Sequence, residues 1–123
     1  MESMFQSNVP IYLQIIAELK RRIAAGELLP GGRVASVREM AAAFGVNPNT
    51  MQRAITQLET LGLVTTNRTL GRTVTENAGA LEEMRRRLAV ECTENFFKEM
   101  GALGYSRGES ADMAQAERKK NDE

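Results

Sequence analysis

Four residues with the chemistry of a turn stand directly before an amphipathic segment: Asn47, Pro48, Asn49 and Thr50. Asn47 can cap a helix by accepting a hydrogen bond from a backbone N–H, and Pro48 suits the first helical position. The free N–H groups and the positive dipole end of such a helix favour an anion such as a phosphate. Asn49 and Thr50 fall in the first turn, where a recognition helix touches base edges. These residues therefore predict the front end of a helix that binds nucleic acid.

The segment 48–61 separates apolar from polar residues at helical spacing. The side expected to face the core holds Met51, Ala54, Ile55, Leu58 and Leu61. The other side holds Asn49, Gln52, Arg53, Thr56 and Thr60. Amides, hydroxyls and a guanidinium can hydrogen-bond to bases and phosphates. The polar side is therefore a candidate DNA-binding face, and the alternative is an ordinary solvated surface.

Other basic residues frame this segment. Arg38 falls in the first turn of a short predicted helix, and Arg33 precedes it. Arg68 and Arg72 flank the tip of a predicted hairpin, where Gly71 would let the backbone approach a minor groove closely. These five residues are added to the candidate DNA-binding set.

The arginines also have plainer interpretations. Arg38 could simply pair with Glu39 or Glu76. Arg68 and Arg72 could serve only to keep the hairpin soluble. The sequence leaves these alternatives open.

Helix signals place three helices before the hairpin. The first is expected over 10–25, with Pro10 at its first position, and its apolar stripe consists of Ile11, Ile15, Ile16, Leu19 and Ile23. Ser36 and Glu39 have the spacing of a capping box, which predicts a second helix from residue 37 to the stop at Gly45. The third helix is the segment 48–61. Two short helices joined by a tight glycine-containing turn form a helix-turn-helix.

A β-hairpin is expected at 63–75, because two short runs rich in Val and Thr flank a loop of about five residues, 67–71. A hairpin directly after a helix-turn-helix is the layout of a winged helix. The predicted fold is therefore mainly α with a small β-hairpin, and the predicted domains are a winged helix-turn-helix DNA-binding domain at 1–77 and a two-helix region at 78–123.

An apolar stripe marks the first helix of this second region, expected over 80–100. Its members are Leu81, Met84, Leu88, Cys92, Phe96 and Met100, with Phe97 widening it. Cys92 is accordingly expected to be a buried small apolar residue. A last helix is expected from Arg107 to about Lys119. So short a region cannot bury its own stripe, so a second subunit is the expected partner, and folding back onto the first helix of the same chain is the alternative.

Composition excludes several classes of protein. The 123 residues carry equal numbers of basic and acidic side chains, no histidine and a single cysteine. An intrachain disulfide is therefore impossible, and no metal-ligand cluster, phosphate-binding glycine loop or general-base histidine indicates an enzyme. No cofactor is predicted. The chain has no apolar run long enough for a membrane helix and no signal peptide at its start, so a cytoplasmic protein without membrane contact is expected.

Residues 10–77 resemble the DNA-binding domain of the GntR family of bacterial transcription regulators. The motifs that carry the resemblance are PIYLQI, GELLPGGR, SVREMA, GVNPNT and LETLGLV. It implies DNA contacts at Arg38, Asn47, Pro48, Asn49, Thr50 and Gln52, with a wing near 68–72. Many members carry arginine where this chain has Pro48 and Gln52, so an operator different from the commonest one is expected.

The short second region is similar to that of the YtrA-like branch of this family. That resemblance implies a homodimer formed through Leu81, Met84, Leu88, Cys92, Phe96 and Phe97. The helix-turn-helix, the wing and the arginine frame predict a sequence-specific repressor of transcription, and a two-fold dimer predicts that its operator in double-stranded DNA is pseudo-palindromic. A small-molecule effector is compatible with this arrangement, and the sequence identifies none. The alternative function is a winged-helix protein-interaction adaptor that does not bind DNA.

Overall fold

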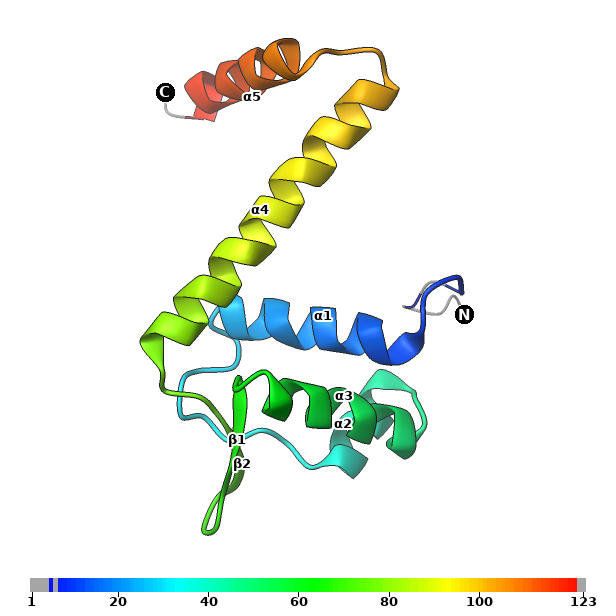
Figure 1. Ribbon diagram of the computed structural model, residues 1–123, viewed down its shortest axis with the longest axis vertical. Coiled ribbons are helices and arrows are strands. Elements are labelled where there is room, and N and C mark those ends of the chain that lie inside the picture. The colour runs from blue at the N-terminus through cyan, green and yellow to red at the C-terminus, as the bar shows by residue number, and fades with distance from the viewer. Residues whose placement is uncertain (1–4, 6, 122–123) are drawn as a thin grey trace. The chain divides into compact units, whose positions relative to one another are not determined.

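The computed structural model describes residues 5 and 7–121 (Figure 1). The elements in chain order are α1 (Ile11–Ala24), α2 (Val37–Phe44), α3 (Pro48–Thr60), β1 (Val64–Asn67), β2 (Gly71–Val74), α4 (Ala78–Ala102) and α5 (Arg107–Asn121). The chain divides into two compact units, Met1–Arg85 and Arg86–Glu123, so the division falls within α4. The family resemblance rests on elements of the first unit.

Local capping determines where the short helices begin. The Ser36 hydroxyl accepts a hydrogen bond from the Glu39 N–H at 3.1 Å, and the Asn47 side chain accepts one from the Asn49 N–H at 2.7 Å. Gly45 takes φ of 68°, a left-handed conformation that lets α2 end and the chain turn at once into α3. Pro10 was predicted to be the first helical residue of α1. The structure shows it one position earlier, as the N-cap, with ψ of 134°. These caps confirm the helix-turn-helix that the sequence predicts.

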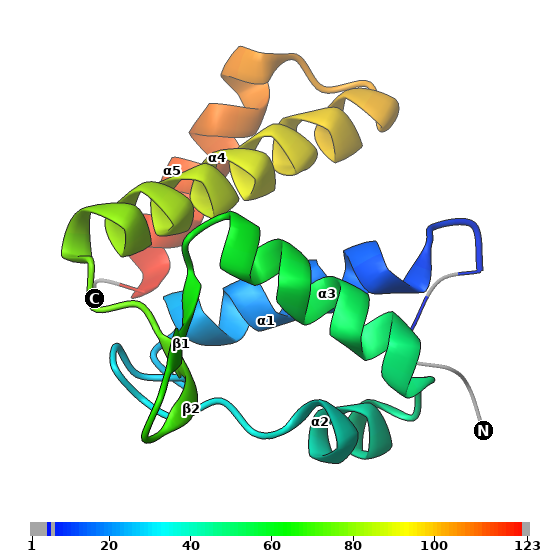
Figure 2. The same cartoon turned by 60° about the horizontal axis from the view of Figure 1, so that its bottom comes forward.

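The core of the first unit lies between three helices and the hairpin base. Figures 1 and 2 show α1 and α3 side by side, with α2 packed against α3. The buried apolar residues of these elements are Ile15, Ile16, Leu19, Ile23, Met40, Ala41, Phe44, Met51, Ala54, Ile55, Leu58, Val64 and Val74. Burial of these side chains is the main force that orients α3 within the unit.

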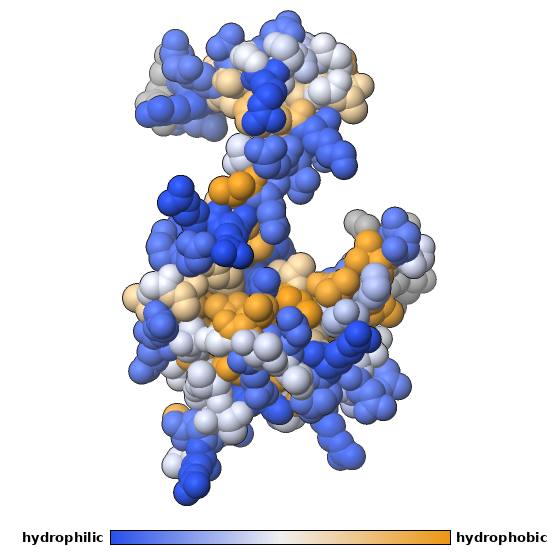
Figure 3. Space-filling view, in the orientation of Figure 1, coloured by the Kyte–Doolittle hydropathy of each residue, from blue (hydrophilic) through white to orange (hydrophobic). Residues whose placement is uncertain are grey.

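Two residues expected on buried stripes are partly exposed. Leu61 is 47% exposed because it is the C-cap of α3, where the chain leaves the helix toward Gly62. Ile11 is 44% exposed in the first turn of α1, and Leu13 is 45% exposed on the same helix. Figure 3 shows apolar surface running along α1. The stripe prediction is therefore right for most of α1 and α3 and wrong at the first residue of α1 and at the C-cap of α3.

The hairpin has a shorter loop than predicted. Val64 pairs with Val74 and Asn67 pairs with Gly71 in antiparallel register, so only three residues, 68–70, form the loop. The Asn67 side chain accepts hydrogen bonds from the Thr69 and Leu70 N–H groups at 2.8 and 3.1 Å. Gly71 closes the loop with φ of 79°, the left-handed position that three-residue hairpin loops require.

The apolar stripe of α4 is largely uncovered within the described residues. Met84, in the first unit, is its only buried member, while Leu81, Leu88, Phe96 and Phe97 are half-buried. Cys92 is exposed, so the expectation that it is a buried small apolar residue is wrong for this chain alone. The physical reason is that no side chain of the described residues covers this position on α4.

Candidate nucleic-acid interface

The outward face of α3 carries uncharged hydrogen-bonding groups. Asn49, Gln52 and Thr56 are exposed. The Gln52 amide nitrogen donates to the Thr56 hydroxyl at 3.1 Å, and the Thr60 hydroxyl donates to the Thr56 carbonyl at 3.0 Å. Because Gln52 and Thr56 are exposed and lie one turn apart, they form a strip that a flat surface such as a base-pair edge can reach.

The front of α3 is open to solvent. Asn47 and Pro48 are exposed, and Thr50 is half-buried in the first turn. The Asn47 side chain accepts from the Asn49 N–H, and the Asn47 carbonyl accepts from the Met51 N–H at 3.1 Å. The positive end of the helix dipole therefore lies at an exposed turn whose donors are only partly satisfied. This is the arrangement that the sequence predicts for a phosphate contact.

Arg53 lies beside α1 instead of pointing freely outward. Its guanidinium carbon is 3.7 Å from the centroid of the Tyr12 ring, a cation–π stack between α3 and α1. A shallow depression next to this stack is lined by Ile11, Tyr12, Asn49, Thr50 and Arg53. Sequence reasoning missed Tyr12, and the signal for it was an aromatic residue in the first turn of α1 outside the buried stripe.

The arginines before and within α2 are exposed. Arg38 makes no hydrogen bond or ion pair with any described residue, so neither Glu39 nor Glu76 neutralises it. The Glu39 carboxylate accepts instead from the Ser36 hydroxyl at 3.0 Å. Arg33 is exposed, and its backbone forms an isolated antiparallel bridge with Thr73, which joins this segment to the hairpin.

The two arginines of the hairpin differ in their contacts. Arg68 is exposed in the three-residue loop. Arg72 pairs with Glu59 near the end of α3, with Nε 2.6 Å from Oε1 and both side chains 31% exposed. The wing is therefore tied to α3 through Arg72, while Arg68 extends its charge away from the core.

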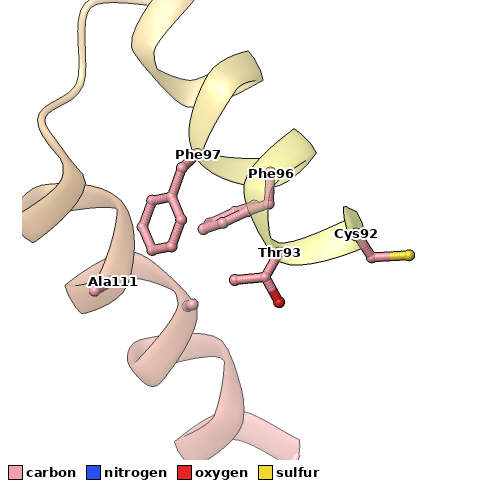
Figure 4. Close-up of a pocket in the computed structure, with 6 residues that line it drawn as sticks. Cys92, Thr93, Phe96, Phe97 and Ala111 are labelled. Atoms are coloured by element: carbon pink, nitrogen blue, oxygen red, sulfur yellow. The ribbon is translucent and has the colours of Figure 1, made fainter. Parts of the chain in front are cut away.

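The second unit contains an apolar pocket (Figure 4). Its lining residues are Cys92, Thr93, Phe96 and Phe97 of α4 and Ala111 and Ala114 of α5. Figure 4 shows Phe96 and Phe97 directed toward α5 and Cys92 directed away from it. Phe97 also stacks under Arg107, whose guanidinium carbon lies 4.2 Å from the ring centroid. Part of the predicted dimer surface thus packs within its own chain.

Metal binding and membrane insertion find little support in the part of the chain that the structure describes. That part holds no group of three or more Cys, Asp or Glu residues placed to bind a metal ion. None of its helices is both long and apolar enough to cross a membrane. The exposed arginines, amides and hydroxyls around α3 are the strongest candidate site.

Comparison with known families and sequences gives a consistent result. Residues 11–74 match the family model described as bacterial regulatory proteins, gntR family. An uncharacterized HTH-type transcriptional regulator of Bacillus subtilis, YhcF, is 44% identical over 109 residues, which cover 89% of this chain and 90% of YhcF. The HTH-type transcriptional repressor YtrA of Bacillus subtilis is 41% identical over 73 residues, 59% of this chain and 56% of YtrA.

Solved structures agree with these matches. A GntR family transcriptional regulator from Listeria monocytogenes is 34% identical with a TM-score of 0.80, covering 91% of this chain and 98% of that one. The DNA-binding domain of AraR in complex with operator ORX1 is 29% identical with a TM-score of 0.54, covering 61% of this chain and 96% of that one. The predicted winged-helix fold is confirmed.

Proposed function

The chain belongs to the GntR family of bacterial regulatory proteins, and we propose that it is a repressor that binds a pseudo-palindromic DNA operator as a homodimer. The observation that carries the proposal is the exposed face of α3, where amides and hydroxyls are framed by arginines from α2, α3 and the wing. The AraR domain, a structural relative, was solved with its operator, and YtrA, a sequence relative, is a repressor. Both support DNA as the partner.

On DNA, α3 would lie in the major groove. Asn49, Gln52 and Thr56 would contact base edges, since amides bind adenine through two hydrogen bonds. Arg33 and Arg38 would contact phosphates on one side of α3. Arg68 would reach a minor groove from the wing, with Gly71 allowing a close backbone approach. Such a protein acts where the DNA is, in the bacterial cytoplasm, and needs no cofactor.

The dimer is proposed to form through the uncovered stripe of α4. Leu88 and Cys92 offer apolar surface that the described chain leaves exposed or half-exposed. A two-fold dimer would place two α3 helices about 34 Å apart, one DNA turn, which explains why the operator should be pseudo-palindromic. No small-molecule effector is assigned.

Selection of bound fragments from random duplexes, followed by titration of the consensus, tests the function. A palindromic consensus with half-sites about one DNA turn apart and nanomolar to tens of nanomolar affinity is expected. Absence of any salt-dependent DNA binding would refute the proposal and favour the protein-interaction adaptor, for which the uncovered α4 stripe would be the docking surface.

Arg38→Ala is expected to weaken binding by about tenfold, because a charge-assisted hydrogen bond to a phosphate is lost. The loss should be equal for operator and unrelated duplexes, and the slope of log affinity against log salt should flatten by about 1.8, because each subunit of the dimer loses one phosphate contact worth about 0.9. Lys98→Ala, which removes an exposed cation from α4, is the control and should leave the slope unchanged. A loss confined to one base pair of the operator would contradict the phosphate assignment.

Alanine substitution of the two wing arginines should have different effects, one on DNA affinity and the other on stability. Arg68→Ala is expected to weaken DNA binding about threefold without changing stability, because its side chain is exposed. Arg72→Ala should lower the free energy of unfolding by up to about 1 kcal/mol, because it breaks the pair with Glu59. Urea denaturation and a DNA titration of both variants measure the two effects. An unchanged free energy of unfolding for Arg72→Ala would show that the Arg72–Glu59 pair contributes nothing to stability.

A further inference from the structure

The stack of Arg53 on Tyr12 divides the polar face of α3 into two strips. Gln52 and Thr56 are joined by a hydrogen bond of 3.1 Å and form one strip. Arg53 follows Gln52 by about 100° around the helix and is drawn to the edge that adjoins α1. Figures 1 and 2 show the first turns of α1 and α3 at the same end of the unit, so Tyr12 meets the front half of α3.

We propose that Tyr12 is a positioning residue that holds the Arg53 guanidinium at the α1 edge of α3, where it binds a DNA phosphate and does not read a base. The inference rests on the proposed DNA-binding function and assigns a role within it. It adds Tyr12 to the interface and assigns Arg53, a member of the candidate DNA-binding face, to a phosphate instead of a base edge.

The geometry of the stack supports this role. A guanidinium that lies at 3.7 Å over an aromatic ring uses its face for the contact and keeps its N–H edges free to donate. The ring therefore fixes the direction of the side chain without occupying its donors. An exposed arginine that is already ordered loses less conformational entropy on binding, so the stack should increase affinity.

The surroundings of the stack favour a phosphate. The depression beside it also contains Asn49 and Thr50, which belong to the first turn of α3 and the positive end of its dipole. Among the residues that the structure describes, no carboxylate lines this depression. When a recognition helix lies in a major groove, the sugar-phosphate backbone runs along its flanks, and the α1 edge is such a flank.

A double-mutant cycle on the full chain tests the coupling. Wild type, Tyr12→Leu, Arg53→Ala and the double variant are titrated with the selected operator and with a scrambled duplex at several salt concentrations. Arg53→Ala should weaken both duplexes by the same factor and flatten the salt slope by about 1.8, which is about 0.9 for each subunit of the dimer. Tyr12→Leu should weaken binding about two- to fivefold when Arg53 is present, and should have no further effect in the Arg53→Ala background.

Two conservative variants separate positioning from folding. Tyr12→Phe keeps the ring and should bind as wild type does. Arg53→Lys keeps the charge but not the planar stack, so it should lose the coupling to Tyr12 while retaining most of the salt slope. Thermal melts of each variant check that the domain remains folded.

Three results would overturn the inference. An Arg53→Ala variant that loses preference at one base pair with an unchanged salt slope would make Arg53 a base reader. Equal losses from Tyr12→Leu in both backgrounds would make Tyr12 a purely structural residue. A wild-type protein that binds no duplex would refute the proposed function itself, and the inference with it.

Discussion

Leu88→Glu is expected to weaken operator binding by about a hundredfold, because it should break the proposed dimer and leave each half-site to be bound by a single chain. Leu88 lies on the α4 stripe and is half-buried by the described residues, so part of its side chain remains open to a second subunit. In the proposed interface a glutamate in each subunit would be buried against apolar surface without a partner of opposite charge, which is strongly unfavourable. Leucine and glutamate have similar helix propensities, so α4 itself should persist.

Val90→Glu is the matched control for this variant. Val90 is 52% exposed and lies about 200° around α4 from Leu88, off the stripe. It should leave both the molecular mass in sedimentation and the operator affinity unchanged. If Leu88→Glu remained a dimer with wild-type affinity, or if Val90→Glu dissociated equally, the α4 stripe would not be the dimer interface.

Leu58→Ala should lower the free energy of unfolding by about 3 kcal/mol, a large part of the 5–15 kcal/mol typical of a domain. Leu58 is 1% exposed and packs on the inner side of α3, so the truncation loses buried apolar surface and leaves a cavity. Because α3 is held in place chiefly by such contacts, DNA binding should fail at temperatures where the wild type still binds. Urea denaturation of the full chain measures the change.

Leu61→Ala provides the comparison on the same helix. Leu61 is 47% exposed at the C-cap, so its truncation should cost well under 1 kcal/mol. Equal losses of unfolding free energy for Leu58→Ala and Leu61→Ala would mean that Leu61 is buried in solution, which contradicts its exposure at the C-cap of α3. The difference between the two variants is therefore a direct test of how far the core extends along α3.

Local signals in the sequence were sufficient for the helix-turn-helix. Ser36 and Asn47 act as the predicted caps because an N-cap needs only a side-chain oxygen and the N–H groups of the next turn. Gly45 ends α2 for a similarly local reason. The three-residue loop was missed because its length depends on whether Asn67 and Gly71 pair across the hairpin, and composition alone does not determine register.

Features that depend on distant contacts were not predictable. Cys92 was expected to be buried because it continues an apolar stripe, but periodicity says which face is apolar and not what covers it. The candidate face of α3 followed from helical spacing, whereas the two contacts that organise its edges did not. Tyr12 meets Arg53 and Glu59 meets Arg72 only because tertiary packing brings separate segments together.

The hydrogen bond between Gln52 and Thr56 has a consequence for how such regulators diverge. Both side chains are exposed and hydrogen-bond to each other on α3 itself, so replacing them changes what α3 can recognise at little cost in stability, within about 0.5 kcal/mol for typical surface positions. A duplicated copy of this chain can therefore acquire a new target through a few substitutions in this strip. The core, the caps and the arginine frame can stay unaltered while the regulatory network around them is rewired.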